Sequence, residues 1–280
     1  MARQPILRSR LPLTTITRHP RPMLAGKVIT IIGGTTGLGL SAARAIVAAG
    51  AKVVIAGRNP DSAAAALAEL GPDARSVIGD AALSDTAERA VSLAIDSFGK
   101  LDGLYHVAGG SGRKFGDGPL HEVTDDGVRA TLALNLDSVI FSNRAAVRAF
   151  LHQNSGGVIL NMASVLGWSP SPRFFSTHVY AAAKAAIIGF SKSTAACYAP
   201  HNIRINVVAP ALVDTPMASR AASNNDILSF IRAKQPLDGG RIGHPEDLDA
   251  AVVWLLSDAA RFCTGQTLAI DGGWSVSEGI

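Results

Sequence analysis

From Gly26 onward, short runs of β-branched and other apolar residues alternate with longer stretches of helical periodicity. We expect strands at 28–32, 52–56, 75–78, 101–107, 157–162, 204–208 and 267–270. Helical patterns lie between them, at 38–49, 61–69, 85–98, 125–153, 179–199 and 245–256. Apolar strands separated by helices are typical of a parallel sheet that is covered on both faces. The alternation therefore predicts a doubly wound α/β fold with a parallel sheet of seven strands.

No linker rich in Pro, Gly or Ser interrupts this pattern, so residues 23–280 are expected to form one domain. Residues 1–22 differ in composition, because they contain five arginines and no acidic residue. The rest of the chain has 21 basic and 22 acidic side chains, which argues against nucleic acid as a partner. An Arg-rich, acid-free start is typical of an organelle-targeting peptide, but its prolines would break the amphipathic helix of such a peptide. We expect a basic, disordered arm at 1–22, and organelle targeting stays open.

Cysteine usage and hydropathy indicate a soluble protein of a reducing compartment. The two cysteines, Cys197 and Cys263, are too few for a disulfide framework and lie in no metal-ligand spacing. No apolar stretch approaches the roughly 20 residues that span a bilayer. We expect a cytoplasmic protein with no metal site and no membrane contact.

A glycine-rich segment, Gly-Gly-Thr-Thr-Gly-Leu-Gly at 33–39, lies between the first predicted strand and the first predicted helix. Glycine permits a tight turn and a close approach of ligand to backbone. The start of the next helix offers unpaired N–H groups and the positive end of a dipole to a pyrophosphate. An ordinary turn can also contain these glycines, but their position in an alternating series favours a Rossmann-type dinucleotide site.

The end of the second predicted strand indicates which dinucleotide is bound. An acidic residue at this position usually holds the ribose hydroxyls of NAD. This chain has Gly57-Arg58-Asn59 instead. An arginine binds a 2′-phosphate well, and the lack of an acid removes the repulsion that would exclude that phosphate. We predict that NADP(H) is preferred and NAD(H) is possible; the alternative is that Arg58 is a solvated residue at a strand end.

Tyr180 and Lys184 are four residues apart in a predicted helix, so their side chains are neighbours on one face. A phenol titrates near pH ~10, and an ammonium one turn away favours the phenolate, which would lower that pKa. The spacing therefore suits a proton donor that works near neutral pH. A packed tyrosine beside a solvated lysine would have the same spacing.

With the glycine turn and the Tyr180/Lys184 pair in place, residues 25–273 resemble the short-chain dehydrogenase/reductase family, in its single-domain branch. Further matches occur in the family's order: Gly33, Gly37 and Gly39 of its Gly-x-x-x-Gly-x-Gly turn, Asp80, Ala108-Gly109, Asn135, Ser164, Asn206-Val-Val-Ala-Pro210 with Thr215, and Asp271-Gly-Gly273. The departures are Ile32 for the family's Thr, His106-Val107 for its Asn-Asn pair, and Ala211 for its Gly. Ser164 and Tyr180 are also farther apart in sequence than is usual, so the segment between them must form a loop.

The resemblance implies an NAD(P)-dependent carbonyl reductase, or ketoreductase, that moves hydride between nicotinamide and a carbonyl or CH–OH carbon. Tyr180 would exchange the proton and Ser164 would fix the carbonyl. Lys184 would lower the tyrosine pKa and bind the nicotinamide ribose, and Asn135 would hold a water. The residues implied in cofactor binding are Gly33, Thr35, Thr36, Gly37, Leu38, Gly39, Arg58, Asp80, Ala81, Ala108, Gly109, Asn135, Tyr180, Lys184, Pro210, Val213 and Thr215.

Members of this family usually form homotetramers or homodimers, so a homo-oligomer is expected. The apolar residues Val139, Phe141 and Val147 are compatible with an interface on their helix, and equally with core packing.

Two segments break the alternation and are candidates for substrate recognition, namely 167–177 and 211–243. Loops beyond the carboxyl ends of strands bind ligands in such sheets. The candidate substrate contacts are Trp168, Phe174, Phe175, His178 and Met217. These side chains fit a pocket for a ketone or a secondary alcohol, and fit packing against the body equally well. Arg173 is a candidate for an anionic substrate.

A function from another class also fits part of the pattern. A catalytically silent dinucleotide-binding protein, acting as a regulator or sensor, needs the glycine turn but not the four proton-transfer residues. Since the chain has all four, an enzyme is favoured.

Overall fold

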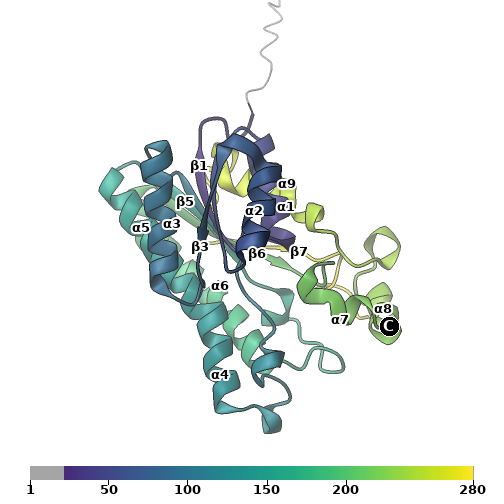
Figure 1. Ribbon diagram of the computed structural model, residues 1–280. Helices are drawn as coiled ribbons and strands as arrows, with labels where there is room; N and C mark the ends of the chain where they lie inside the picture. The colour runs from purple at the N-terminus through teal and green to yellow at the C-terminus, as the bar shows by residue number, and fades with distance from the viewer. Residues whose placement is uncertain (1–21, 280) are drawn as a thin grey trace, which may run out of the picture.

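Seven parallel strands form one sheet in the order β3-β2-β1-β4-β5-β6-β7, within residues 22–279, which are those that the computed structural model describes (Figure 1). The strands are β1 Val28–Ile32, β2 Lys52–Gly57, β3 Ala74–Ile78, β4 Gly103–His106, β5 Gly157–Met162, β6 Ile203–Pro210 and β7 Thr267–Ile270. The predicted doubly wound fold is confirmed, and the predicted strands differ from these only at their ends. The predicted basic arm, apart from Pro22, lies outside the described residues.

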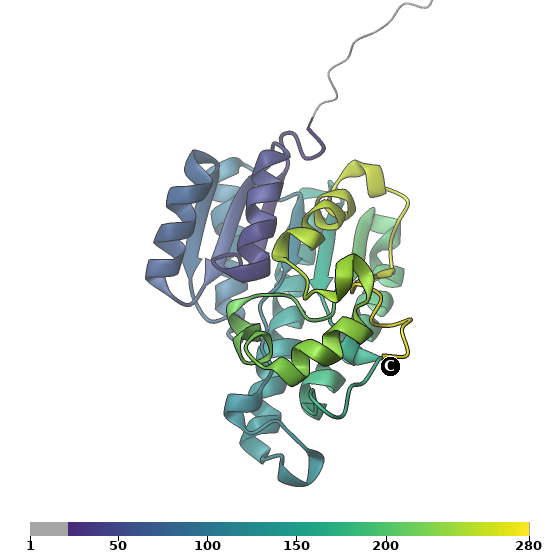
Figure 2. The same cartoon turned by 90° about the vertical axis from the view of Figure 1, so that its right-hand side faces the viewer.

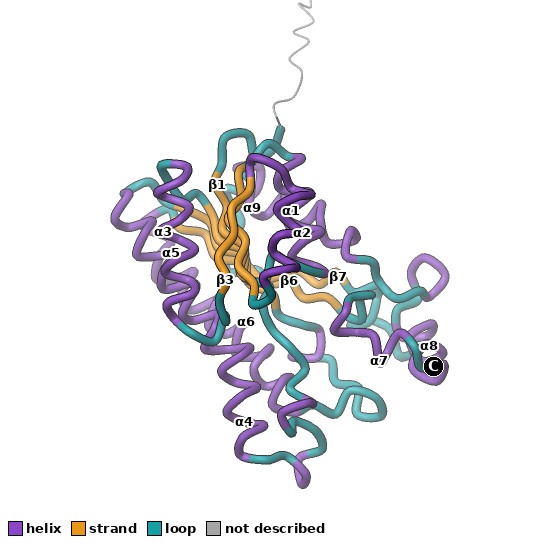
Figure 3. The backbone as a smooth tube through the Cα atoms, in the orientation of Figure 1, coloured by secondary structure: helices purple, strands orange, loops and turns teal. Residues whose placement is uncertain are grey.

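Helices cover both faces of the sheet (Figure 3). They are α1 Gly37–Ala48, α2 Pro60–Leu70, α3 Ser84–Phe98, α4 Asp125–Leu132, α5 Ser138–Gln153, α6 His178–Tyr198, α7 Ser219–Ala222, α8 Asn225–Lys234 and α9 Asp249–Leu256. The layer of α1, α2 and α9 packs on one face, and α3, α5 and α6 pack on the other (Figures 1 and 2). Across the described part of the chain, no helix has the length and apolar character needed to cross a bilayer.

Strand β1 shows why apolar residues occupy successive positions of the strands. Ile29 and Ile31 pack in the core beneath α1 and α9, whereas Val28 and Ile32 pack in the second core beneath α3 and α5. Successive side chains of a strand point to opposite faces, so a sheet that is covered twice favours apolar residues on both faces of each strand. These two cores fix the sheet, and with it the positions of the loops at both edges.

The predicted helix over 125–153 is wrong in its middle. It consists of α4 and α5, joined by a π-helical turn at Ala133–Asp137 that contains Asn135. The Asn135 side-chain amide donates to the carbonyl oxygen of Thr131 at 2.9 Å, inside the helical ladder. A side chain inserted into the ladder distorts it locally, and π turns often mark functional positions.

The long segment at 211–243 is also more ordered than predicted, because it contains α7 and α8. Both helices lie apart from the two layers, beyond the carboxyl ends of the strands (Figure 2). Of the two alternatives for the apolar residues of α5, core packing holds for Val139 and Val147, which are buried in the cores of this chain, and Phe141 is half-buried.

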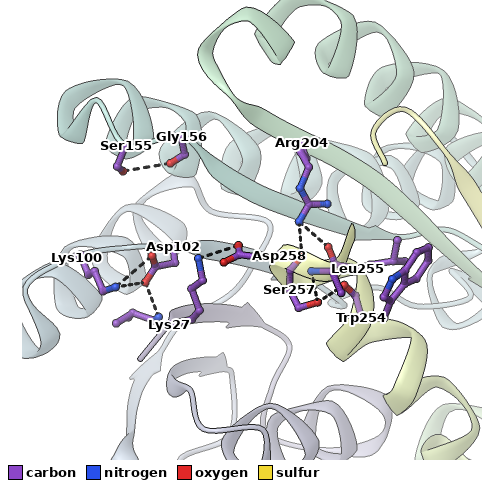
Figure 4. A network of polar contacts seen from close by, with 12 residues as sticks. Lys27, Lys100, Asp102, Ser155, Gly156, Arg204, Trp254, Leu255, Ser257 and Asp258 are labelled. Carbon is purple, nitrogen blue, oxygen red and sulfur yellow. Dashed lines mark hydrogen bonds and ion pairs between the residues drawn. The ribbon is translucent and has the colours of Figure 1, made fainter. Parts of the chain in front are cut away.

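The amino edge of the sheet carries a network of polar contacts that ties elements together (Figure 4). The Asp102 carboxylate accepts a 2.8 Å hydrogen bond from the backbone N–H of Val28, at the start of β1. Arg204, near the start of β6, donates to the carbonyl oxygens of Leu255 and Ser257 at the end of α9, each at 3.0 Å. These side chains satisfy backbone groups, so this edge has a structural role.

Candidate active site

A cavity of about 530 Å³ opens at the opposite, carboxyl edge of the sheet. It is lined by the turns after β1 to β6 and by α7, and it spans the point between β1 and β4 where the strand order reverses. Ligands of doubly wound sheets bind at this point, because neighbouring loops diverge there. All of the predicted cofactor residues line the cavity except Asn135.

The glycine turn leaves no room for side chains at two positions. A Cβ on Gly39 would lie 2.0 Å from the carbonyl oxygen of Gly33, and Gly33 itself has a φ of +92°. At the N-terminus of α1 the Thr36 side chain caps no backbone N–H, and Thr36, Gly37 and Leu38 all line the cavity. The free amides and the helix dipole therefore suit an anionic pyrophosphate.

At its far end the cavity is lined by Arg58, in the turn after β2, and by Asp80, in the turn after β3. Within residues 22–279 the Arg58 guanidinium has no acidic group within ion-pair distance. Asn59 does not face a ligand freely, because its side chain caps α2 by accepting from the N–H of Ser62 at 2.8 Å. Arg58 is thus the cation available at this end.

Ser164 and Tyr180 both lie in the wall of the cavity, although they are sixteen positions apart in the sequence. Ser164 follows β5 and Tyr180 is in the first turn of α6. Burial raises the pKa of Tyr180, and a hydrogen bond with the Ser164 side chain acts in the opposite direction. The predicted lowering of this pKa by Lys184 is corrected: in the protein without nucleotide, burial of the phenol is the larger effect.

Lys184 lies one turn along α6, with its Nζ 5.5 Å from the centre of the Tyr180 ring. Its side chain is buried, and the ammonium donates to the carbonyl oxygen of Met162 at 3.0 Å. Burial lowers the pKa of Lys184 to about 8, because the desolvated ammonium loses its hydration. The site therefore holds a cation that can lose its proton within reach of neutral pH.

Asn135 is fully buried behind the cavity wall. Its carbonyl oxygen accepts from the N–H of Gly110 at 3.1 Å, and its amide donates to the carbonyl oxygen of Gly110 at 2.9 Å. A Cβ on Gly109 would lie 2.9 Å from this Asn135 oxygen and 3.3 Å from Lys184 Nζ, so glycine is needed there. In this structure Asn135 fixes the loop after β4 directly.

The sequence and the fold were compared with known proteins. A family model described as Enoyl-(Acyl carrier protein) reductase matches residues 33–275. The structure resembles that of a short-chain type dehydrogenase/reductase from Mycobacterium ulcerans, with a TM-score of 0.83, 30% identity, and 91% of each chain covered. The chain belongs to the short-chain dehydrogenase/reductase family. Members of this family bind NAD(P) and are oxidoreductases. This protein is likewise an oxidoreductase of the family.

Curated members of the family include dehydrogenases that are similar over nearly their whole length. The 2,5-dichloro-2,5-cyclohexadiene-1,4-diol dehydrogenase of Sphingobium indicum is 34% identical, over 90% of this chain and 98% of the relative. The 3beta-hydroxysteroid dehydrogenase 2 of Eggerthella lenta is 35% identical, over 92% of this chain and 98% of the relative. A 3-ketoacyl-(acyl-carrier-protein) reductase from Brucella melitensis, solved with NADH, has a TM-score of 0.80 and 28% identity, over 90% of this chain and all of its own.

His106, where the family commonly has Asn, is accommodated in a buried polar cluster. Its Nδ1 lies 2.7 Å from the Ser142 hydroxyl, and its Nε2 lies 3.1 Å from the carbonyl oxygen of Ala108 and 3.3 Å from the Ser138 hydroxyl. Burial, and then repulsion from Lys184, lowers the pKa of His106 to about 3, so the ring is neutral. The neutral imidazole therefore connects β4 to α5.

Asp117 supports α6 at the end that carries Tyr180, and sequence reasoning missed it. Its carboxylate accepts from the backbone N–H of Val179 at 3.1 Å and of Tyr180 at 2.8 Å. The N-cap residue Thr177 makes no side-chain cap, so an acid some sixty residues earlier replaces it. No pattern within the sequence links Asp117 to α6.

Replacing Asp117 by Ala should lower the free energy of unfolding by about 1–2 kcal/mol, the usual effect of removing a helix cap. Asp117→Asn should lose less, because its side-chain oxygen still accepts one of the two bonds. Chemical denaturation of both variants measures the free energy of unfolding. Asp96→Ala is the control, because Asp96 is an exposed acid near the C-terminal end of α3. An Asp117→Ala protein as stable as the control would contradict the capping role.

The structure places the five predicted substrate residues in different surroundings. Phe175 and Met217 line the cavity. The other three do not: the Trp168 side chain is 43% exposed, His178 is exposed at the start of α6, and Phe174 packs on Phe230, with ring centres 5.3 Å apart. Sequence order alone could not separate the inward-facing residues of an irregular loop from the others.

The lining residues that were not among the predicted contacts include Arg113, Arg220 and Trp274. Trp274 is buried, its ring packs edge-on to Phe175 and Phe230, and its Nε1 donates to the carbonyl oxygen of Ser169 at 3.3 Å. It thereby joins the C-terminal segment to the loop before Tyr180.

Proposed function

We propose that this protein is an NADP(H)-dependent oxidoreductase that interconverts a ketone and a secondary alcohol, with Tyr180 as the general acid and base. The position of Ser164 and Tyr180 in the lining of one cavity carries this proposal, since the same cavity continues to the glycine turn. A reactant held at these hydroxyls and a dinucleotide held at the turn would share one enclosed space.

The residues suit the charge that develops in this reaction. When bound, the nicotinamide supplies or accepts the hydride. As a ketone is reduced, negative charge grows on its oxygen, which then needs a proton and a donor already in place. Tyr180 gives the proton, and Ser164 donates a hydrogen bond to the same oxygen. The Lys184 ammonium stabilises the phenolate that Tyr180 becomes when it loses this proton.

The preference for NADP(H) rests on Arg58. Its guanidinium lines the cavity without an acidic partner in the described chain, where an acid would otherwise select NAD(H). A 2′-phosphate would complete this site with charge-assisted hydrogen bonds.

Steady-state kinetics with each cofactor should give a kcat/KM for NADPH at least about tenfold above that for NADH. Arg58→Ala should remove most of this ratio by weakening NADPH alone, because only NADPH carries the phosphate. Arg75→Ala is the matched control, since Arg75 lies over the Phe98 ring outside the cavity. Equal values for the two cofactors in the wild type, or an NADH preference, would refute the assignment.

For the substrate we propose a cyclic ketone or secondary alcohol. The relatives from Sphingobium indicum and Eggerthella lenta are named for ring alcohols, and the lining residues Phe175, Met217 and Trp274 offer apolar surface. A panel of cyclic and linear ketones, followed by NADPH absorbance, tests the function. Tight NADPH binding with no turnover of any ketone would favour a regulatory or sensor protein instead.

We also propose a cytoplasmic homo-oligomer, either a tetramer or a dimer, with a basic arm in front of one catalytic domain. The usual assembly of the family and the two free cysteines support this proposal. Light scattering that gave a monomer mass would exclude the oligomer.

A further inference from the structure

Two arginines from distant parts of the chain converge on the substrate side of the cavity. Arg113 lies in a short 3₁₀ turn at Arg113–Phe115, and Arg220 lies in α7. Both line the cavity, and both donate through Nη2 to the same carbonyl oxygen, that of Phe174, at 3.2 Å and 3.4 Å. Phe174 belongs to the loop that leads into Tyr180, so the pair lies beside that loop.

No acidic side chain neutralises this pair in the part of the chain that the structure describes. Neither guanidinium forms an ion pair there, and the one acid lining the cavity is Asp80, after β3. Asp117 attracts Arg113 electrostatically, but its two oxygens already accept the α6 amides. Burial lowers the pKa of Arg113, and repulsion from Arg220 lowers it further.

Most of the donors of this pair are unused. Each guanidinium has five N–H groups, and among the described contacts each donates one of them to Phe174. Two like charges held close together repel each other, and an oxyanion between them would remove that repulsion and accept several charge-assisted hydrogen bonds. An oxyanion is therefore the ligand that this arrangement suits.

The geometry points to a substrate that carries an oxyanion, either a carboxylate or a phosphate ester, held by Arg113 and Arg220 while its carbonyl lies at Ser164 and Tyr180. This inference rests on the proposed function and adds the chemical class of the substrate. The predicted anion contact Arg173 is replaced by this pair: Arg173 does not line the cavity, and its guanidinium lies 4.8 Å from the centre of the Phe174 ring.

Ligand binding to the full-length protein saturated with oxidised NADP tests this inference, because a ketone cannot be reduced in that complex. Calorimetry would compare two matched pairs: a keto-substituted cyclohexanecarboxylate with its methyl ester, and 4-oxocyclohexyl phosphate with 4-hydroxycyclohexanone. In one pair, the anionic member should bind about tenfold or more tightly than the neutral one, as expected for charge-assisted hydrogen bonds. The pair that shows the difference identifies the oxyanion.

Variants connect that preference to the two arginines. Arg113→Gln and Arg220→Gln should each reduce it to about threefold or less. Arg113→Lys and Arg220→Lys should keep part of it, since the charge stays, and Arg173→Gln should leave it unchanged. Thermal melting shows whether each variant is folded. If a Gln variant unfolds, the Lys variant at the same position decides. A Lys variant that kept the whole preference for the anion, or increased it, would then overturn the inference.

Several results would overturn the inference. Equal binding of anionic and neutral members in both pairs would do so, as would Gln variants that keep the preference. Weaker binding of oxidised NADP itself in those variants would assign the arginines to the cofactor instead. Turnover of ketones by the wild type is measured separately: selective anion binding without any turnover would refute the proposed function while leaving the oxyanion site.

Discussion

Tyr180→Phe should lower kcat by about 10²–10⁴-fold, the range that a positioned general acid contributes. The Tyr180 phenol is the group placed to give a proton to the substrate oxygen that Ser164 also contacts. Phenylalanine keeps the ring and removes that proton. The ring and α6 remain, so the dissociation constant of NADPH should change by less than about threefold. Single-turnover reduction of a ketone and fluorescence titration of NADPH measure the two quantities separately.

Tyr198→Phe is the matched control for this substitution. It removes a phenol from the last turn of the same helix, outside the cavity lining, and should leave kcat unchanged. A Tyr180→Phe protein that was fully active would refute the assignment of Tyr180. A variant that lost NADPH binding as well would show that Tyr180 supports the cofactor site rather than the proton transfer.

Lys184→Met should make the protein without nucleotide more stable at pH 7, by about 1–3 kcal/mol, while lowering kcat about a hundredfold. The reason is that burial lowers the pKa of Lys184 to about 8, so the folded state holds the ammonium at a cost at neutral pH. Methionine has a similar shape and no charge to desolvate. Denaturant titration at pH 7 measures the stability and steady-state turnover measures kcat.

The pH dependence of the free energy of unfolding tests whether the buried ammonium costs stability. Between about pH 8 and 10.5, the ordinary pKa of a lysine, the unfolded chain keeps the Lys184 proton while the folded protein has lost it. The free energy of unfolding of the wild type should therefore rise through this window relative to that of the Met variant. Lys192→Met, at an exposed position of α6, should leave the rise intact. A Lys184→Met protein that is less stable at pH 7 would contradict the costly ammonium.

One departure from the predicted helices shows where local patterns reach their limit. The sequence over 125–153 has helical periodicity throughout, and nothing local marks the π turn at Ala133–Asp137. That turn depends on Asn135, whose side chain is held by Gly110 in the loop after β4. A contact across 25 positions decides a local geometry, so periodicity could not predict it.

The sequence by itself determined the seven strands, their parallel arrangement and the glycine turn, because each depends on local order or spacing. Its resemblance to the family predicted Ser164, Tyr180 and Lys184 as a group. Only the tertiary structure decided which loop residues face the cavity. It also showed the Asp117 cap and the convergence of Arg113 and Arg220 on Phe174. The physical reason is that these contacts join side chains and backbone groups from separate loops. Their positions follow from how the sheet and the two cores place those loops in space.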